Sequence, residues 1–342
     1  MKSEKPIISR MNFRFNRREY ATVLIIILIL VISAIYKPQL FIGAQRSELI
    51  HSMLLWLPLI VTVAVGMMMV ICLGNIDVSV GSIVGLTGMI VGYLFKFHDM
   101  PFWLGVVAAM VIGMAAGAFN GLFISYLGIP SLIMTLATMN LYRGAALMVT
   151  GGVEIDAFSM PKLMSVLVRE GPIPKLNVPW LVWIALLIGV IMIFIMRYSH
   201  FGREVYAVGN NENAAMLRGI NVKRVRFIVF TLTGMFSGIA GLMYGSRYGY
   251  FNPSNTGNGL EFVVIAATVI GGVSMSGGTG NIVGVLLGCL LLGVVQTMIP
   301  SLGFSTFYNK AIYGLIILIS LLIDKNIQNS QIRYIVKKGV TL

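Results

Sequence analysis

Polar side chains interrupt a very apolar sequence in the stretch LGNIDVSVGS, which covers residues 73–82. Asn75, Asp77 and Ser79 can all hydrogen-bond to a polar molecule. Such groups are costly inside a membrane, so those that occur there are often functional. One interpretation is that Asp77 only caps a helix that begins at Val78. The other is that the three side chains line a route for a polar solute at a break in a membrane helix. The sequence leaves both interpretations open.

Two further amides, Asn120 and Asn140, lie in other apolar stretches. We take them, with the first three residues, as candidates for lining the same route. Amides in membrane helices also hydrogen-bond to neighbouring helices, so a packing role is the alternative for each of them. The stretch GGVSMSGGTGN at 271–281 resembles a second interruption of a membrane helix.

The elements that must position these residues are membrane helices. The chain is 57% hydrophobic and only 11% charged, whereas a soluble domain has about a quarter of its residues charged. Its apolar residues form blocks close to the roughly 20 residues that a helix needs to cross a bilayer. We therefore expect an all-α, polytopic membrane protein of about ten transmembrane helices, some short or broken. The expected spans are 20–36, 52–73, 78–95, 102–127, 131–149, 179–197, 227–247, 259–274, 281–299 and 307–323.

The basic residues set an expected orientation. The net charge is +13, and 16 of the 25 Lys and Arg residues fall in three segments: six in 1–19, six in 197–226 and four from 324 onwards. Because basic residues mark cytoplasmic loops, ten spans with a cytoplasmic N-terminus place all three segments inside. We expect the basic N-terminus at 1–19, a permease domain at 20–323 and a cytoplasmic tail at 324–342. No nucleic-acid partner is needed to explain the charge.

The four tryptophans fit the same scheme, since they lie near the ends of expected spans, where aromatic residues form belts at the two membrane surfaces. They are Trp56, Trp103, Trp180 and Trp183.

The polar stretch FGREVYAVGNNENAAMLRGINVKRVR at 201–226 predicts ordered structure between two spans. Asn210 or Asn211 can cap a short helix at its start. Gly219 can end that helix in the left-handed conformation, and Asn221 can cap the next one. The short helix either lies in the lipid headgroups or docks on a cytoplasmic partner.

No motif for catalysis stands out in the chain. It has no phosphate-binding loop of the GxxxxGK[ST] type, no HExxH pair and no GxSxG turn, so we expect neither an enzyme nor a bound cofactor or metal. Cys72 and Cys289 are expected to be buried thiols. A self-contained secondary transporter, with Asp77 carrying a proton, and an intramembrane enzyme are the less favoured classes.

Three motifs, in order, carry a family resemblance: GNIDVSVGSIVGLTG (74–88), the 201–226 stretch above and IAATVIGGVSMSGGTGNIVG (265–284). They resemble the ribose-type branch of permeases from ABC sugar importers, over about residues 20–324. The resemblance implies a subunit of a bacterial inner-membrane importer. Its implied partners are a second homologous permease, an extracytoplasmic binding protein and a cytoplasmic ATPase that binds the ATP.

Within that branch the chain is most similar to permeases of autoinducer-2 import systems, on the stretches NIDVSVGSI (75–83), LYRGAALMVTGG (141–152) and NPSNTGNGLEFVVIAA (252–267). Ribose or another monosaccharide is the alternative substrate. The resemblance also implies that 198–226 holds the helix that couples the permease to its ATPase. The matching residues there are Glu212, Ala214, Ala215 and Gly219.

Overall fold

The computed structural model describes residues 17–173, 176–319 and 322. Within these residues helices dominate and no β-strand forms, apart from one isolated antiparallel bridge between Ile155 and Phe251. The elements are α1 (Arg17–Tyr36), η1 (Pro38–Phe41), α2 (Gly43–Cys72), α3 (Val80–His98), α4 (Phe102–Tyr126), α5 (Ser131–Thr150), η2 (Ala157–Ser159), α6 (Lys162–Arg169), α7 (Trp180–Tyr198), α8 (His200–Asn210), α9 (Glu212–Leu217), α10 (Val222–Tyr248), α11 (Leu260–Ile270), α12 (Ile282–Ser301) and a last helix, Phe307–Ile319.

Helices lie at the positions of all ten expected spans. Eight in the described part of the chain are long and apolar enough to cross a membrane, namely α1, α2, α3, α4, α5, α7, α10 and α12. The other two expected positions hold the shorter apolar helices α11 and Phe307–Ile319. The prediction of an all-α, polytopic membrane protein with some short spans is thus confirmed. The expected segments 1–19 and 324–342 fall outside the described residues, except for 17–19.

One helix begins well before its expected span. We placed a span at 52–73, but α2 begins at Gly43. Arg46, Glu48 and His51 give this first part a polar composition that a hydropathy pattern does not assign to a membrane helix. Trp56 therefore lies inside α2, whereas the sequence placed it near the start of a span.

Proline sets the start of several helices. Pro101, Pro130, Pro161 and Pro179 each immediately precede a helix, in extended backbone. Proline has no N–H to donate and disfavours a helical residue before it, so a helix begins readily at this point. Three of them, Pro101, Pro130 and Pro179, explain why the starts of α4, α5 and α7 were predictable to within one residue.

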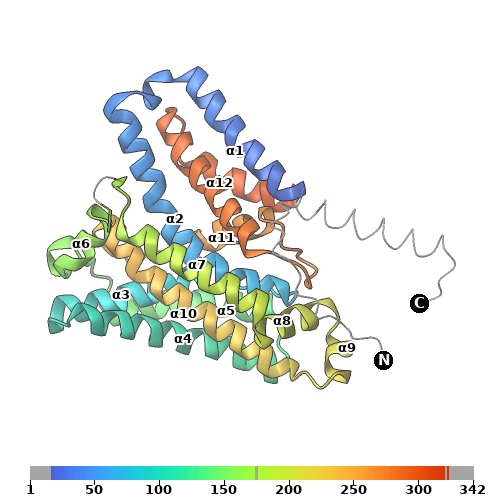
Figure 1. Cartoon of the computed structure of the whole chain (residues 1–342). Helices are drawn as coiled ribbons and strands as arrows, with labels where there is room; N and C mark the ends of the chain where they lie inside the picture. The colour runs from blue at the N-terminus through green and yellow to red at the C-terminus, as the bar shows by residue number, and fades with distance from the viewer. Residues whose placement is uncertain (1–16, 174–175, 320–321, 323–342) are drawn as a thin grey trace.

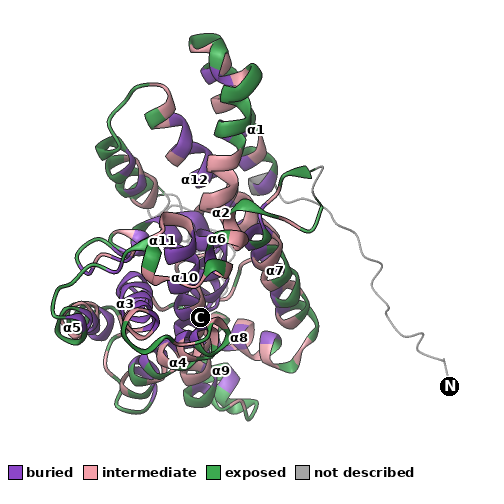
Figure 2. Cartoon of the chain, turned by 90° about the vertical axis from the view of Figure 1, so that its left-hand side faces the viewer, coloured by how far each residue is buried: buried purple, intermediate pink, exposed green. Residues whose placement is uncertain are grey.

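The core lies where the second half of α2 packs with α3, α10 and α11. Every residue from Pro58 to Cys72 in α2 is buried. In Figure 2 the buried segments gather around α3, α10 and α11, whereas exposed side chains cover the outside of helices such as α1. Exposed apolar residues on the outer helices are what a lipid-facing surface requires.

A second apolar cluster joins α1, α12 and the start of α2, which stand together at one side of the bundle in Figure 1. Its buried members come from α1, η1, α2 and α12, and include Ile26, Leu40, Leu49 and Leu291. Lys37 Nζ donates to the carbonyl oxygen of Ser301 at 2.8 Å, which places the last residues of α1 and α12 side by side.

Helices α4 and α10 cross in close contact. A Cβ atom on Gly117 would lie 2.3 Å from the carbonyl oxygen of Phe230, and one on Gly113 equally close to that of Gly234. Glycine at four-residue spacing lets two backbones touch, because no side chain separates them. The small residues of α4 in GMAAGAFNG (113–121) and of α10 in GMFSGIAG (234–241) therefore serve packing.

The segment 249–259 lies along α3. Phe251 is fully buried, and its ring occupies the space that a Cβ atom on Gly88 or Gly92 would need. Farther along, the Gly257 carbonyl and the Glu261 carboxylate approach Gly81. The segment thus reaches from the end of α10 to the beginning of α3, and α11 begins at that point.

The long connection between α5 and α7 lies at the end of α3. Ile155 pairs with Phe251 through two backbone hydrogen bonds of 2.8 and 3.0 Å. Lys96 Nζ lies 3.3 Å from Asp156 Oδ2. The hydrogen bond from Ser159, together with Lys96, lowers the pKa of the Asp156 carboxyl. These contacts hold the connection against the same end of the bundle as segment 249–251.

Candidate functional site

Four segments gather at one end of the bundle, which we call the α9 end: the start of α1, residues 73–79, helices α8 and α9, and residues 271–281. The Gly278 N–H donates to the Cys72 carbonyl oxygen at 2.8 Å, and Tyr206 Oη donates to that of Gly280 at 2.9 Å. Asn281 Nδ2 donates to Glu19 Oε1 at 2.8 Å. The two interruptions seen in the sequence therefore lie in contact with each other and with α8.

A buried hydrogen-bond network fixes the start of α3. Asp77 Oδ1 accepts from the Ser79 backbone N–H at 2.8 Å and from Ser79 Oγ at 2.6 Å. Asn120 Nδ2 on α4 donates to Ser79 Oγ at 2.8 Å. Tyr142 Oη on α5 donates to the Ala116 carbonyl oxygen at 2.8 Å and lies 3.3 Å from Asn120 Oδ1. The network thus joins α3, α4 and α5.

Helix α5 also supplies acceptors for the backbone of the 73–79 segment. Ser131 Oγ accepts from the Ile76 N–H and Thr135 Oγ1 from the Val78 N–H, both at 3.3 Å. The second carboxylate oxygen of Asp77, Oδ2, is buried without a hydrogen-bond partner. Asp77 therefore fixes the turn before α3 with one oxygen, through the N-cap residue Ser79, and has one oxygen left.

The five candidate path residues are not all together. The structure brings Asp77, Ser79 and Asn120 into one network. Asn75 donates to the nearby Leu73 carbonyl oxygen. Asn140 is exposed on α5 and bonds to the Leu136 carbonyl oxygen of its own helix. Tyr142 and Thr135 were missed, because a tyrosine or threonine in an apolar span has no spacing that marks it.

Helices α8 and α9 form the predicted ordered segment. Asn211 Oδ1 accepts from the Ala214 N–H at 2.9 Å, and Asn221 Oδ1 accepts from the Arg224 N–H at 3.0 Å. Gly219 has φ of +82°, the left-handed conformation that ends a helix. All three predicted capping positions are confirmed, Asn211 being the cap of the two asparagines considered. Helix α8 was not predicted.

Helix α9 presents an exposed apolar tip. The Leu217 side chain is 90% exposed and Met216 is half-exposed, whereas Ala215 is buried against the bundle. Glu212 Oε2 lies 2.8 Å from Arg226 Nη2, which ties the start of α9 to α10. Of the implied coupling residues, Glu212, Ala214 and Gly219 are exposed and Ala215 is not. An exposed leucine on a capped, tethered helix suits a docking contact.

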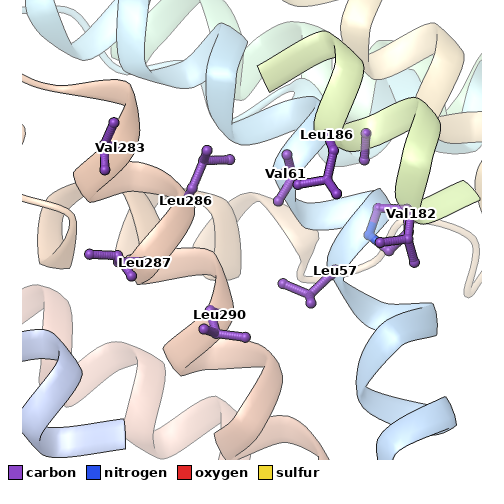
Figure 3. Close-up of a pocket in the computed structure, with 10 residues that line it drawn as sticks. Leu57, Val61, Val182, Leu186, Val283, Leu286, Leu287 and Leu290 are labelled. Atoms are coloured by element: carbon purple, nitrogen blue, oxygen red, sulfur yellow. The ribbon is translucent and has the colours of Figure 1, made fainter. Parts of the chain in front are cut away.

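The described residues offer no metal site, and one cavity among them has no polar lining. They contain no group of three or more His, Cys, Asp or Glu residues that could hold a metal ion. A cavity of about 270 Å³ between α2, α7 and α12 is lined by aliphatic side chains together with Pro58, and Figure 3 shows Leu57, Leu186 and Leu286 around it. Nothing in that lining can hydrogen-bond to a hydroxylated ligand.

Comparison with known proteins gives the family. Residues 49–321 match the family described as the permease component of branched-chain amino acid transport systems. The chain belongs to this permease family. The 73–79, α8–α9 and 271–281 segments of the α9 end all lie within the matched region. No solved structure gives a significant match.

Three relatives agree in name. The chain is 32% identical to the autoinducer 2 import system permease protein LsrC of Escherichia coli (strain K12 / DH10B), over 92% of this chain and 89% of the relative. The proteins of that name from Yersinia pseudotuberculosis (serotype O:1b) and Yersinia enterocolitica (serotype O:8) are 33% and 34% identical. The matches cover 92% and 90% of this chain, and 86% and 83% of the relatives. The resemblance to ABC import permeases of the autoinducer-2 type is confirmed.

The buried network predicts different roles for two amides that look alike in the sequence. We expect Asn120→Ala to lower the free energy of unfolding by about 1–3 kcal/mol, because Ser79 and Tyr142 lose a buried partner. Asn140→Ala is the matched control and should change it by less than about 0.5 kcal/mol, since that amide is exposed. Thermal unfolding of both purified variants in detergent measures the difference, and equal shifts would contradict a structural network.

Proposed function

We propose that this chain is a permease subunit of an ABC importer that carries autoinducer-2 across the inner membrane of a bacterium. A separate ATPase subunit supplies the energy by binding and hydrolysing ATP. The observation that carries the proposal is similarity to autoinducer-2 import permeases along about nine-tenths of the chain. A second, homologous permease subunit and an extracytoplasmic binding protein complete the importer.

The α9 end supports an orientation. Basic residues are exposed on and beside α9, including Arg203, Arg218, Lys223 and Arg224. Basic residues stay on the cytoplasmic side. The α9 end then faces the cytoplasm, as does the N-terminus that precedes α1, and a tenth crossing returns the C-terminus to the same side. The ATPase meets α9 there, with Leu217 at the contact.

The orientation predicts the labelling of a cysteine at position 213. Asn213 is exposed on α9, while the native Cys72 and Cys289 are buried and give little background. In intact cells Asn213→Cys should react with a membrane-permeant maleimide and not with an impermeant one. In inside-out vesicles both reagents should label it. Labelling of intact cells by the impermeant reagent would reverse the orientation.

The docking role of α9 predicts that a charge at its tip uncouples transport. We expect Leu217→Glu to reduce uptake roughly tenfold or more, because a buried charge at a central contact disrupts binding between subunits. The side chain is exposed in this chain, so membrane insertion and thermal stability should stay unchanged. Leu217→Met, which keeps an apolar tip, is the control.

The measurement for Leu217 is ATP hydrolysis and uptake by the reconstituted complex, with co-purification of the ATPase as the readout for docking. Full uptake by Leu217→Glu would contradict a coupling contact at this residue.

The substrate is tested by uptake in cells that lack this gene and in cells that carry it on a plasmid. We expect the deletion to abolish uptake of labelled autoinducer-2, the plasmid to restore it, and ribose uptake to stay unchanged. Loss of ribose uptake alone would move the substrate to that sugar and overturn the autoinducer-2 assignment. Uptake that depends on an ion gradient and persists without the ATPase would indicate a secondary transporter.

A further inference from the structure

A cavity of about 590 Å³ lies at the other end of the bundle from α9. Its walls come from α2, the last turns of α10, the start of α11, α12 and the helix Phe307–Ile319. Binding sites for small molecules have volumes of about 300–1,000 Å³ and combine apolar walls with a few polar groups. The side chains that give this cavity its character are Trp56, Tyr244, Tyr248, Gln296, Asn309 and Tyr313.

One wall is aromatic and held in place. The Trp56 and Tyr248 rings meet edge to face, with centroids 6.3 Å apart, and the Tyr244 and Tyr248 centroids are 4.4 Å apart. The Arg247 guanidinium lies 4.3 Å from the centre of the Trp56 ring and 5.1 Å from that of Tyr248. Cation–π contact of this kind stabilises ring orientation. The cavity therefore has a preformed flat surface.

Another part of the lining offers an amide without a partner. Asn309 is 2% exposed, lines the cavity, and has no hydrogen bond to either its amide nitrogen or its amide oxygen. Buried polar groups in native proteins are nearly always paired, so an amide whose donor and acceptor are both unpaired indicates a missing partner. An amide donates and accepts, as does a hydroxyl group, so a hydroxylated ligand satisfies both atoms.

The lining has little charge. Among the described residues that line the cavity none is acidic, and Lys310, which is exposed, is the one basic residue. Gln296 contributes a second amide, whose oxygen accepts from Tyr313 Oη. Leu59, Leu260 and Val263 are buried apolar residues of the same lining. This combination suits a neutral molecule that has both hydroxyl groups and an apolar face.

We propose that this cavity receives the transported solute on the side away from the ATPase, and that it binds a small, uncharged, polyhydroxylated molecule of monosaccharide size. Trp56 packs on the apolar face of the solute and Asn309 bonds to its hydroxyl groups. The proposal rests on the proposed function, since it identifies residues that contact the substrate of that importer. Asp77, Ser79 and Asn120 belong to the opposite end and are not part of this site.

The decisive variant is Asn309→Leu in the full complex. It removes an unpaired buried amide and keeps the number of side-chain atoms other than hydrogen, so the thermal stability of the chain should stay the same or rise. The maximal rate of autoinducer-2 uptake should fall about tenfold, as expected when hydrogen bonds to a bound molecule are lost. ATP hydrolysis stimulated by the loaded binding protein should stay within about twofold of wild type. Gln39→Leu removes an exposed amide of η1 and is the control that should transport normally.

Trp56 gives a second test. We expect Trp56→Ala to lower the uptake rate and Trp56→Phe to restore most of it, because phenylalanine keeps a flat face. Wild-type uptake by both Asn309→Leu and Trp56→Ala overturns the proposal. A loss of uptake that comes with an equal loss of thermal stability indicates a structural role and overturns it as well.

A binding measurement separates this proposal from the proposed function. In a variant whose Trp103, Trp180 and Trp183 are changed to Phe, Trp56 is the only tryptophan left. We expect autoinducer-2 or ribose to change its fluorescence, and Asn309→Leu to abolish that change. If the wild type transports neither solute but the fluorescence change is seen, the importer assignment is wrong and the binding site in the cavity is upheld. If the wild type transports one of the solutes but neither changes the Trp56 fluorescence, the proposed binding site in the cavity is wrong.

Discussion

Non-helical backbone that lies buried among apolar helices must find partners for its N–H groups, and residues 73–79 are the place where this chain meets that requirement. A helix satisfies its own backbone, but an extended segment does not. Here the partners are side chains of α5 and of the segment itself: Ser131 for Ile76, Thr135 for Val78, and Asp77 for Ser79. Asn120 and Tyr142 complete the arrangement from α4 and α5. The relative positions of three membrane helices thus follow from a short run of unpaired backbone.

The two ends of the molecule differ in how completely their buried polar groups are paired. The α9 end is held by directional hydrogen bonds, several of them fully buried. The other end contains the larger cavity, with an aromatic wall and an unpartnered amide. Helix α10 connects the two ends. It begins three residues after Gly219 and is tied to α9 by the ion pair of Glu212 with Arg226. Its last turns place Tyr244 and Tyr248 in the cavity wall. A force applied to α9 therefore has a continuous helix along which to act.

The sequence predicts much of this fold because membrane spans and helix ends depend on local chemistry. A run of apolar residues forms a span, proline precedes its start, and Asn211, Gly219 and Asn221 cap the helices around α9 for reasons contained in a few residues. The start of α2 was missed because charged residues there lower the hydropathy of a segment that is nonetheless helical. Trp56 was misplaced as a consequence.

The candidate site was only partly predictable for a different reason. Asn120 and Asn140 are both single amides in apolar stretches, and only the packing of α4 and α5 decides that one is buried in a network and the other exposed. The cavity draws its lining from five helices and the 255–259 loop, and its members Trp56 and Tyr313 are 257 residues apart in the sequence. No local pattern marks such residues. A buried amide without a partner is visible only after every neighbour has been placed.

These differences in bonding also constrain how the chain can move during transport. Separating Ser79 from Asn120 or Asp77 would leave buried polar groups unpaired, at a cost of about 1–3 kcal/mol for each group. Apolar contacts, such as those within the cluster of Ile26, Leu49 and Leu291, are exchanged for other apolar contacts or for lipid without such a cost. A transport movement of low energy therefore keeps the starts of α3 and α5 and the second half of α4 together as one unit. It changes the packing around that unit, where α10 carries the contact with α9 on one side and the wall of the cavity on the other.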